Sequence, residues 1–220
     1  MPSDYAIVST REAHIGLEAG AQRLRASKLK RLIDVLGAGL GLVFLLPLFI
    51  LIASLICLES RGNPIFQQRR TGYKGKTFVI YKFRTMSVAE DGDRVVQAVR
   101  GDSRVTQLGS FLRRSSIDEL PQLLNVFKGE MSLVGPRPHA VAHDEYYGQA
   151  ITGYSGRFDA KPGITGLAQV SGFRGGTEDI ALMAARVARD VDYIRHWSLW
   201  LDMQILLRTL WVGPFDPSAY

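Results

Sequence analysis

Two adjacent carboxylates, Asp118 and Glu119, stand in the string SIDELPQ at residues 116–122. Proline is tolerated in the first turn of a helix, so we expect Asp118 to be a helix N-cap with Pro121 third in that helix. Backbone N–H groups and the helix dipole favour ionised carboxylates there. An ionised Asp with a Glu beside it can hold Mg²⁺, and it can attack phosphorus. Plain helix capping within a solvated charge cluster is the alternative.

Basic residues at three further places favour phosphate chemistry. Lys82 and Arg84 end a predicted strand, and Arg113 lies shortly before the carboxylates. Arg137 stands on the rigid turn GPRP at residues 135–138. The planar fork of arginine matches phosphate oxygens, and a rigid mount lowers the cost of ordering it. Carboxylates, a metal ion and arginines are the parts that phosphoryl transfer needs, provided that the fold brings them together.

An apolar run without a charged residue extends over 24 positions, from Val35 to Leu58. A membrane-crossing helix needs roughly 20 such residues. Pro47 lies at the centre of the run, where it removes a backbone donor, and both flanks are basic (residues 23–31 and 61–76). Because positive flanks stay in the cytoplasm, we expect residues 28–60 to form a re-entrant helix-break-helix. A straight spanning helix with a mild kink is the alternative.

The composition limits the class of protein. With 46% hydrophobic residues among 220, the chain is too apolar to be disordered, and a mean hydropathy of +0.03 excludes several membrane crossings. A lone cysteine, Cys57, excludes a disulfide framework and a cysteine-based zinc site. The net charge of +6 fits contact with anionic lipid or a phosphorylated substrate. No nucleic-acid partner is expected, because no known nucleic-acid-binding string is present.

Turn residues and hydrophobic periodicity predict the remaining elements, and we expect an α+β, mostly helical fold. Residues 1–27 read as a tail or short surface helix, followed after the apolar segment by a cytoplasmic catalytic domain over residues 61–220. The elements expected in that domain are a β-hairpin over residues 63–83, a mobile loop over 87–103, helices over 108–128 and 139–150, a turn at 161–166, and one helix from Glu178 to about Trp211. Because tryptophan prefers the membrane interface, the last helix either lies on the bilayer as an amphipathic interfacial helix or packs its aromatic residues into the core.

Six strings in this order resemble the bacterial sugar transferases, which are monotopic polyprenyl-phosphate phosphoglycosyl transferases. The resemblance covers about residues 28–220. The strings are Lys30-Arg31 with Asp34, YKFRTM at 81–86, SIDELPQ at 116–122, MSLVGPRP at 131–138, KPGITG at 161–166 and WSLWLD at 197–202. Residues 135–143 and 172–175 resemble most the catalytic domain of undecaprenyl-phosphate glucose phosphotransferases.

The resemblance implies a re-entrant membrane helix and a covalent mechanism. Asp118 would attack the β-phosphate of a UDP-sugar, release UMP and carry the phospho-sugar until undecaprenyl phosphate accepts it. By the same resemblance, Asp118 and Glu119 would hold Mg²⁺. The residues that would bind phosphate groups are Lys82, Arg84, Arg113 and Arg137.

The expected function is therefore transfer of glucose-1-phosphate as the first membrane step of exopolysaccharide or capsule assembly. The expected location is the cytoplasmic face of the bacterial inner membrane, with membrane lipids as partners. Galactose-1-phosphate is the alternative sugar, and a non-catalytic membrane-anchored scaffold is the alternative class. The sequence leaves the assembly open, with a homodimer as one alternative.

Overall fold

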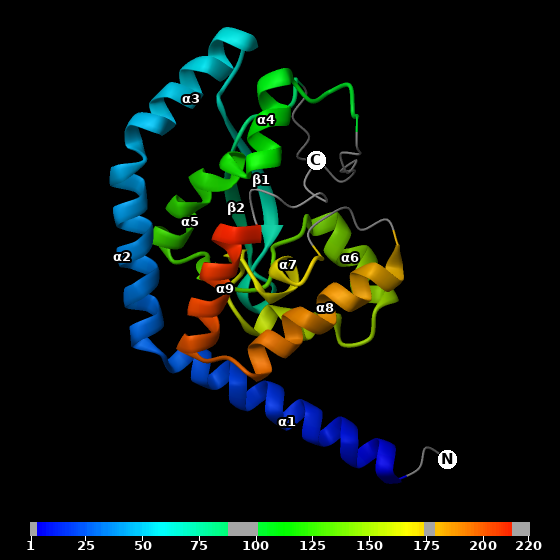
Figure 1. The fold of residues 1–220 in the computed structure, drawn as a ribbon. Coiled ribbons are helices and arrows are strands. Elements are labelled where there is room, and N and C mark those ends of the chain that lie inside the picture. Colours follow the sequence, from blue (N-terminus) through cyan, green and yellow to red (C-terminus); the bar gives the residue numbers. More distant parts are fainter. Residues whose placement is uncertain (1–3, 88–100, 174–178, 213–220) are drawn as a thin grey trace.

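The computed structural model describes residues 4–87, 101–173 and 179–212 (Figure 1). It confirms a mostly helical α+β fold. The α-helices are α1 (Asp4–Ala26), α2 (Lys28–Phe44), α3 (Leu46–Glu59), α4 (Gln107–Ser115), α5 (Leu123–Lys128), α6 (Val141–Ala150), α7 (Leu167–Val170), α8 (Ile180–Arg195) and α9 (Leu199–Val212). The strands are β1 (Ile65–Thr71), β2 (Thr77–Phe83), β3 (Ser132–Val134) and β4 (Gly163–Thr165), and the 3-10 helices are η1 (Tyr73–Gly75), η2 (Ile117–Gln122) and η3 (Tyr154–Asp159). The loop expected over residues 87–103 falls mostly outside the described residues.

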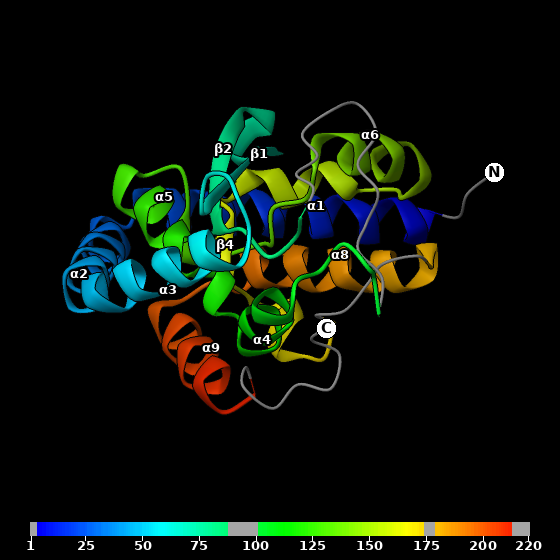
Figure 2. The same ribbon diagram turned by 90° about the horizontal axis from the view of Figure 1, so that it is seen from above.

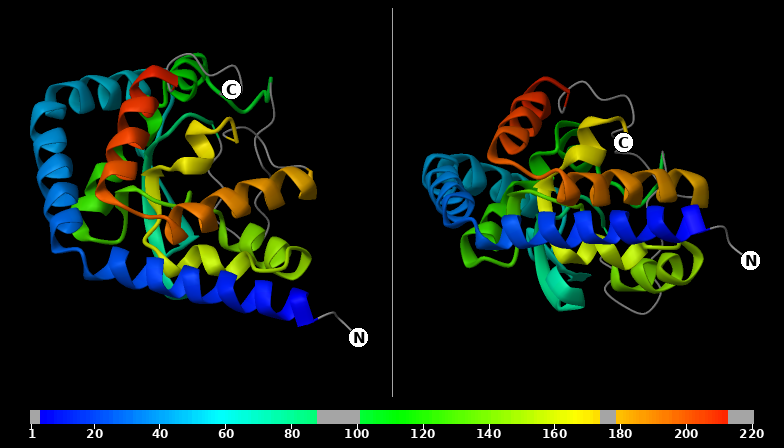
Figure 3. Two further views of the ribbon diagram at one scale, coloured as in Figure 1. Left: turned by 60° about the horizontal axis from the view of Figure 1, so that its bottom comes forward. Right: turned by 90° about the horizontal axis from the view of Figure 1, so that it is seen from below.

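Helix α1 lies alongside α8, as Figure 3 shows. It is a helix of 23 residues rather than the expected tail or short surface helix. Ala21 and Leu24 on its C-terminal half are buried against α8 in one apolar cluster with Ile194. Gly20 permits this close approach, because a Cβ there would lie 2.2 Å from the carbonyl oxygen of Ile194.

Helices α2 and α3 form a bent pair along one edge of the molecule (Figures 1 and 2). Their axes differ by 60° at a break around Leu45, which confirms the break predicted near Pro47. Pro47 lies in the first turn of α3, where its missing N–H leaves no helical hydrogen bond unmade. Among the described residues no single helix has the length and apolar character to cross a membrane. This bent pair meets that test only when its two helices are taken together.

The inner face of α2 packs on α5 and β3 through small residues. A Cβ on Gly37 would lie 2.9 Å from the Leu133 side chain, and one on Gly41 would lie 3.0 Å from that of Leu123. The opposite face of the bent pair is apolar and exposed: Leu40 is 57% exposed, Phe44 77% and Leu58 83%.

The C-terminal segment is two helices, so the single helix predicted from Glu178 to about Trp211 is wrong. Helix α8 ends at Arg195 and α9 begins at Leu199. Trp197 in the break is buried, and its indole nitrogen donates to Asp202 at 3.1 Å. Asp202 also accepts from Lys30 of α2 at 2.7 Å. The chain turns after α8 because this buried ion pair draws α9 toward α2. Trp200 and Trp211 remain exposed.

The hairpin predicted over residues 63–83 is confirmed, with β1 antiparallel to β2 and Gln68 opposite Ile80. A second sheet was not predicted: β3 pairs in parallel with β4, where the sequence indicates only a turn at residues 161–166. Two glycines make this pairing possible, since a Cβ on Gly163 would lie 2.1 Å from the backbone nitrogen of Gly135. The sheet fixes the start of the turn that carries Arg137.

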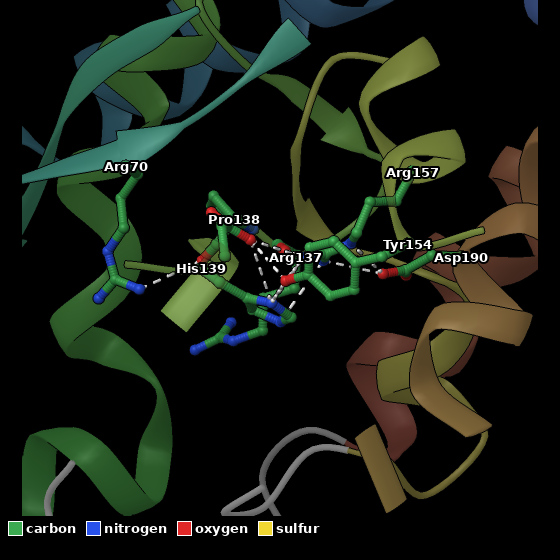
Figure 4. A network of polar contacts seen from close by, with 8 residues as sticks. Arg70, Arg137, Pro138, His139, Tyr154, Arg157 and Asp190 are labelled. Atoms are coloured by element: carbon green, nitrogen blue, oxygen red, sulfur yellow. Dashed lines mark hydrogen bonds and ion pairs between the residues drawn. The ribbon is translucent and has the colours of Figure 1, made fainter. Parts of the chain in front are cut away.

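A buried polar network joins this turn to η3, α6 and α8 (Figure 4). Arg157 donates to Asp190 at 2.9 Å and to the Tyr154 hydroxyl at 3.0 Å. The hydroxyl lies 2.8 Å from Nδ1 of His139 and donates to Asp144. Burial, followed by the charge of Arg157 and other arginines, holds the pKa of His139 well below its ordinary value. The charged side chains that act on His139 are Arg70, Arg137, Arg157 and Arg186, with Asp144 as the nearby carboxylate. His139 is therefore neutral in the fold.

We expect His139 to make the protein less stable as the pH falls below about 6.5, the ordinary pKa of histidine. The unfolded chain takes up a proton that the folded chain refuses, so the free energy of unfolding falls by up to about 1.4 kcal/mol per pH unit for this group. Denaturant unfolding in detergent between pH 5 and 7.5 measures this effect. Buried carboxyl groups with raised pKa values change the free energy of unfolding with pH in the opposite direction, and they do so in both proteins. The contribution of His139 is therefore the difference between the parent and His139→Gln in how the free energy of unfolding changes with pH.

The matched control is His196→Gln, which changes a histidine that is 64% exposed at its side chain. Below pH 6.5, we expect the free energy of unfolding to fall less with falling pH in His139→Gln than in His196→Gln. Equal slopes in all three proteins would contradict the neutral state of His139.

Candidate active site

The carboxylate pair lies in η2, directly after a sharp reversal of the chain. Ser116 has φ of 57° and ends α4, and its N–H donates to the Arg113 carbonyl at 3.1 Å. Its own carbonyl accepts the Glu119 N–H at 3.2 Å, so Ser116 rather than Asp118 is the N-cap of η2. The predicted capping role of Asp118 is therefore wrong. The left-handed conformation of Ser116 moves the cap two residues earlier, and Asp118 and Glu119 occupy the second and third positions of η2.

Glu119 is held between two cations from distant parts of the chain. Lys82 reaches it from β2, with its Nζ 2.7 Å from Oε1. Arg137 reaches it from the turn after β3 and donates from both terminal nitrogens, at 3.0 Å to Oε2 and by a shorter contact to Oε1. Burial opposes ionisation of Glu119, but the charges of Arg137 and Lys82 outweigh it and hold its pKa well below the ordinary value. Three of the predicted site residues thus converge.

Asp118 is buried beside this group but differs from Glu119 in its bonding. Its side chain forms no hydrogen bond or ion pair with any residue that the structure describes. Burial raises its pKa to about 6, Lys82 opposes that rise, and the neighbouring charge of Glu119 adds to it. Arg113 also lowers the pKa of Asp118, which places this predicted residue near the carboxylate. A buried carboxylate without a partner is available for bond formation, whereas Glu119 is committed to its cations.

The donor set fits Mg²⁺ shared with a phosphorylated substrate. Within the described ranges no group of three or more His, Cys, Asp or Glu could hold a metal ion. Mg²⁺ is commonly bound by one or two carboxylates plus substrate phosphates, so Asp118 and Glu119 would suffice. Because both oxygens of Glu119 already accept from cations, Lys82 or Arg137 would turn toward the phosphates as the ion binds. A diphosphate would also offset the added positive charge.

Arg84 has its contacts elsewhere. Its guanidinium donates to the Arg61 carbonyl at 2.6 Å and to the Ser60 carbonyl at 2.7 Å. These are the first groups beyond the C-terminal end of α3, so Arg84 ties the bent helix pair to the hairpin that carries Lys82. Gly62, with φ of 116°, lets the chain pass close to it, since a Cβ there would lie 2.4 Å from the Arg84 guanidinium. Phosphate binding by Arg84 stays a prediction.

Two features near the site were not predicted from the sequence. Gln122 closes η2 and is only 1% exposed, and its amide nitrogen has no hydrogen-bond partner among the described residues. Arg157 and Asp190 are both 2% exposed and lie behind the Arg137 turn. Gln122 stands inside the SIDELPQ string, so its position was visible in the sequence. No local pattern links Arg157 with Asp190, because 33 residues separate them.

Known proteins are similar in sequence to most of this chain. The family model described as "Bacterial sugar transferase" matches residues 25–215. A UDP-glucose:undecaprenyl-phosphate glucose-1-phosphate transferase of Caulobacter vibrioides is 57% identical over 181 residues, covering 82% of this chain and 68% of the relative. A protein of the same name from Klebsiella pneumoniae is 48% identical over 87% of this chain but only 41% of its own length. The exopolysaccharide production protein ExoY of Sinorhizobium fredii is 41% identical over 88% of both chains.

These relatives differ in length, and the chain spans less than half of the Klebsiella protein. The residues matched by the family model, 25–215, include the bent helix pair, the hairpin and the carboxylate pair. The resemblance seen in the six sequence strings is thereby confirmed, and the chain belongs to the bacterial sugar transferase family.

Proposed function

We propose that this protein transfers glucose-1-phosphate from UDP-glucose to undecaprenyl phosphate, as a step of exopolysaccharide synthesis. The observation that carries the proposal is the buried carboxylate of Asp118, which has no hydrogen bond to any described residue and lies beside Glu119, Lys82 and Arg137. The names of the Caulobacter and Klebsiella relatives supply the donor and the acceptor. The rhizobial relative is named for exopolysaccharide production, which supports the pathway.

The chemistry follows in two displacements at one phosphorus atom. A carboxylate oxygen of Asp118 attacks the β-phosphorus of UDP-glucose, and the bond from that phosphorus to the bridging oxygen breaks. UMP leaves with the electron pair, and glucose-1-phosphate stays bound to Asp118. A phosphate oxygen of undecaprenyl phosphate then attacks the same phosphorus, and the carboxylate of Asp118 is restored. Lys82, Arg113 and Arg137 neutralise the charge of the phosphates and orient them.

The proposed cofactor is Mg²⁺, and Asp118 and Glu119 are the residues that would hold it. When bound, the ion neutralises charge on the diphosphate of the donor. Glu119 contributes a carboxylate that remains ionised, because Arg137 and Lys82 hold its pKa low against burial. Release of those cations from Glu119 would make them available to the substrate phosphates.

The proposed setting is the cytoplasmic face of the inner membrane, with α2 and α3 inserted as a re-entrant pair. Support comes from their exposed leucine, isoleucine and phenylalanine side chains, since an apolar surface of this kind marks a site of contact with a membrane or another protein. Basic flanks on both sides favour a cytoplasmic position for each end. The exposed Trp200 and Trp211 of α9 fit the membrane interface. This setting places one site within reach of a soluble donor and a lipid acceptor.

Asp118→Asn should abolish the covalent intermediate and lower UMP release by on the order of 10³-fold or more, because the amide cannot act as the nucleophile. The assay incubates the membrane-reconstituted protein with undecaprenyl phosphate and either UDP-glucose or UDP-galactose, and follows UMP. Mass spectrometry of protein quenched without acceptor locates the adduct. Asp192→Asn, at a position on α8 whose side chain is 40% exposed, is the control. An adduct on another residue, or full activity of Asp118→Asn, would overturn the mechanism. Faster turnover of UDP-galactose would change the sugar only.

Glu119→Gln should raise the Mg²⁺ concentration for half-maximal activity by at least about 10-fold, because one charged ligand is lost. The measurement is a Mg²⁺ titration of UMP release, with thermal unfolding recorded in parallel to verify the fold. Glu145→Gln, at an exposed position of α6, serves as the matched variant. An unchanged Mg²⁺ requirement in Glu119→Gln would exclude Glu119 as a ligand.

Cysteines placed on both flanks of the bent pair should react from the same side of the membrane. Glu18→Cys in α1 and Lys76→Cys in the hairpin are made in a Cys57→Ser background and labelled with an impermeant maleimide in sealed inverted vesicles. We expect both to label in inverted vesicles and neither in right-side-out spheroplasts. Labelling of the two positions from opposite sides would mean a spanning helix.

A further inference from the structure

We propose that Arg157 is a positioning residue for Arg137, acting through the backbone of the GPRP turn; the inference rests on the proposed function. Arg157 lies in η3, and its Nη2 donates to the carbonyl oxygen of Arg137. The guanidinium of Arg137 in turn binds both carboxylate oxygens of Glu119. Figure 4 shows Arg157 and Asp190 gathered around this turn.

The turn depends on its carbonyl groups for fixation. Pro136 and Pro138 have no N–H to donate, so the segment offers few backbone donors. The Pro136 carbonyl accepts the Gly163 N–H at 2.9 Å, which is a backbone contact beside the β3–β4 sheet. The next two carbonyls accept from side chains instead: that of Arg137 from Arg157, and that of Pro138 from Arg70 at 3.3 Å. Arginines therefore continue the anchoring where the sheet ends.

Arg157 is itself fixed by a buried partner on α8. Its Nη2 and Nε lie 2.9 and 3.3 Å from Oδ2 of Asp190, and both residues are 2% exposed. A buried ion pair of this kind holds its geometry, because moving one charge away leaves the other desolvated and unpaired. The planar fork lets one side chain bind Asp190 and the Arg137 carbonyl together, which the single ammonium group of a lysine cannot reproduce.

The other end of the guanidinium has partners of its own, apart from His139, which lies near both terminal nitrogens. Nη1 donates to the Tyr154 hydroxyl at 3.0 Å and lies beside His139 and Asp144. Those contacts do not include Arg137. The hydrogen bond to the Arg137 carbonyl comes from Nη2 alone, whereas the contacts with the Tyr154 hydroxyl and Asp144, which join η3 to α6, are made by Nη1. Tyr154→Phe removes the hydroxyl that Nη1 contacts and leaves the hydrogen bond from Nη2 in place, so it is the matched control.

If Arg157 acts on catalysis through Arg137, a substitution of Arg157 should lower the activity only while Arg137 is intact. The absence of Arg157 would let the turn shift, and a misplacement of about 1 Å at a reacting group can cost about 100-fold in rate. The test is a double-mutant cycle of Arg157→Lys and Arg137→Lys, with kcat and KM for UDP-glucose and thermal unfolding measured for each protein. Asp190→Asn repeats the cycle without altering Arg157 itself, in case Arg157→Lys fails to fold.

We expect Arg157→Lys and Asp190→Asn each to lower kcat/KM by about 10- to 100-fold, and to lower it by less than about 3-fold more when Arg137→Lys is already present. Tyr154→Phe should lower the unfolding temperature and change kcat/KM by less than about 3-fold. The positioning role would be overturned if the losses in kcat/KM of the single variants multiplied fully in the double variants. It would also be overturned if Tyr154→Phe lost as much activity as Arg157→Lys. A parent protein without UMP release would instead refute the proposed function.

Discussion

The ion-paired state of Glu119 is the constraint on which the arrangement of the site depends. One carboxylate accepts from Lys82 on the hairpin and from Arg137 on the turn after β3, and it belongs to η2, which follows α4. Three segments far apart in sequence are thereby held within a few ångströms of one another. The neighbouring Asp118 shares neither of these ion pairs, and its side chain has no hydrogen bond to any residue that the structure describes. Adjacent residues of the same chemical type thus reach different states through their surroundings, one fixed and ionised and the other buried with a raised pKa.

A further buried ion pair, between α2 and α9, supports this arrangement at the end of β3. Lys30 of α2 binds Asp202 of α9 and also donates to the Val134 carbonyl, three residues before Arg137. The Tyr193 hydroxyl of α8 donates to Asp202 at 2.7 Å and lies 3.1 Å from the same carbonyl. Buried ion pairs add little net stability, because desolvation offsets the attraction between the charges. Their effect here is positional: they fix how the bent helix pair, α9 and the strand leading to the site lie relative to one another.

The parts that could be predicted from sequence are those set by local patterns. Alternating residues around a Gly-rich turn predict the hairpin, and Pro47 within an apolar run predicts the break between α2 and α3. The grouping of Lys82 and Arg137 with Glu119 was expected only from their residue types and from resemblance. What local patterns missed is long-range. The β3–β4 sheet needs two glycines 28 positions apart to meet, and the end of α8 is set by the contact of Asp202 with a lysine 172 residues away. The predicted cap at Asp118 was wrong because it was assigned from residue preference, whereas the left-handed Ser116 decides where η2 begins.

The hydrogen bonds of Arg84 link the bent helix pair to the carboxylate site. Lys82 and Arg84 stand two residues apart, and Arg84 binds the carbonyls directly after α3 while Lys82 binds Glu119. A movement of α3 is therefore passed to the strand that carries Lys82. Short apolar helices adjust to bilayers of different thickness by tilting or by deforming the lipid around them. The turnover rate in the proposed setting should consequently vary with the acyl-chain length of the host lipid, so that the bilayer would act as a mechanical regulator of the enzyme.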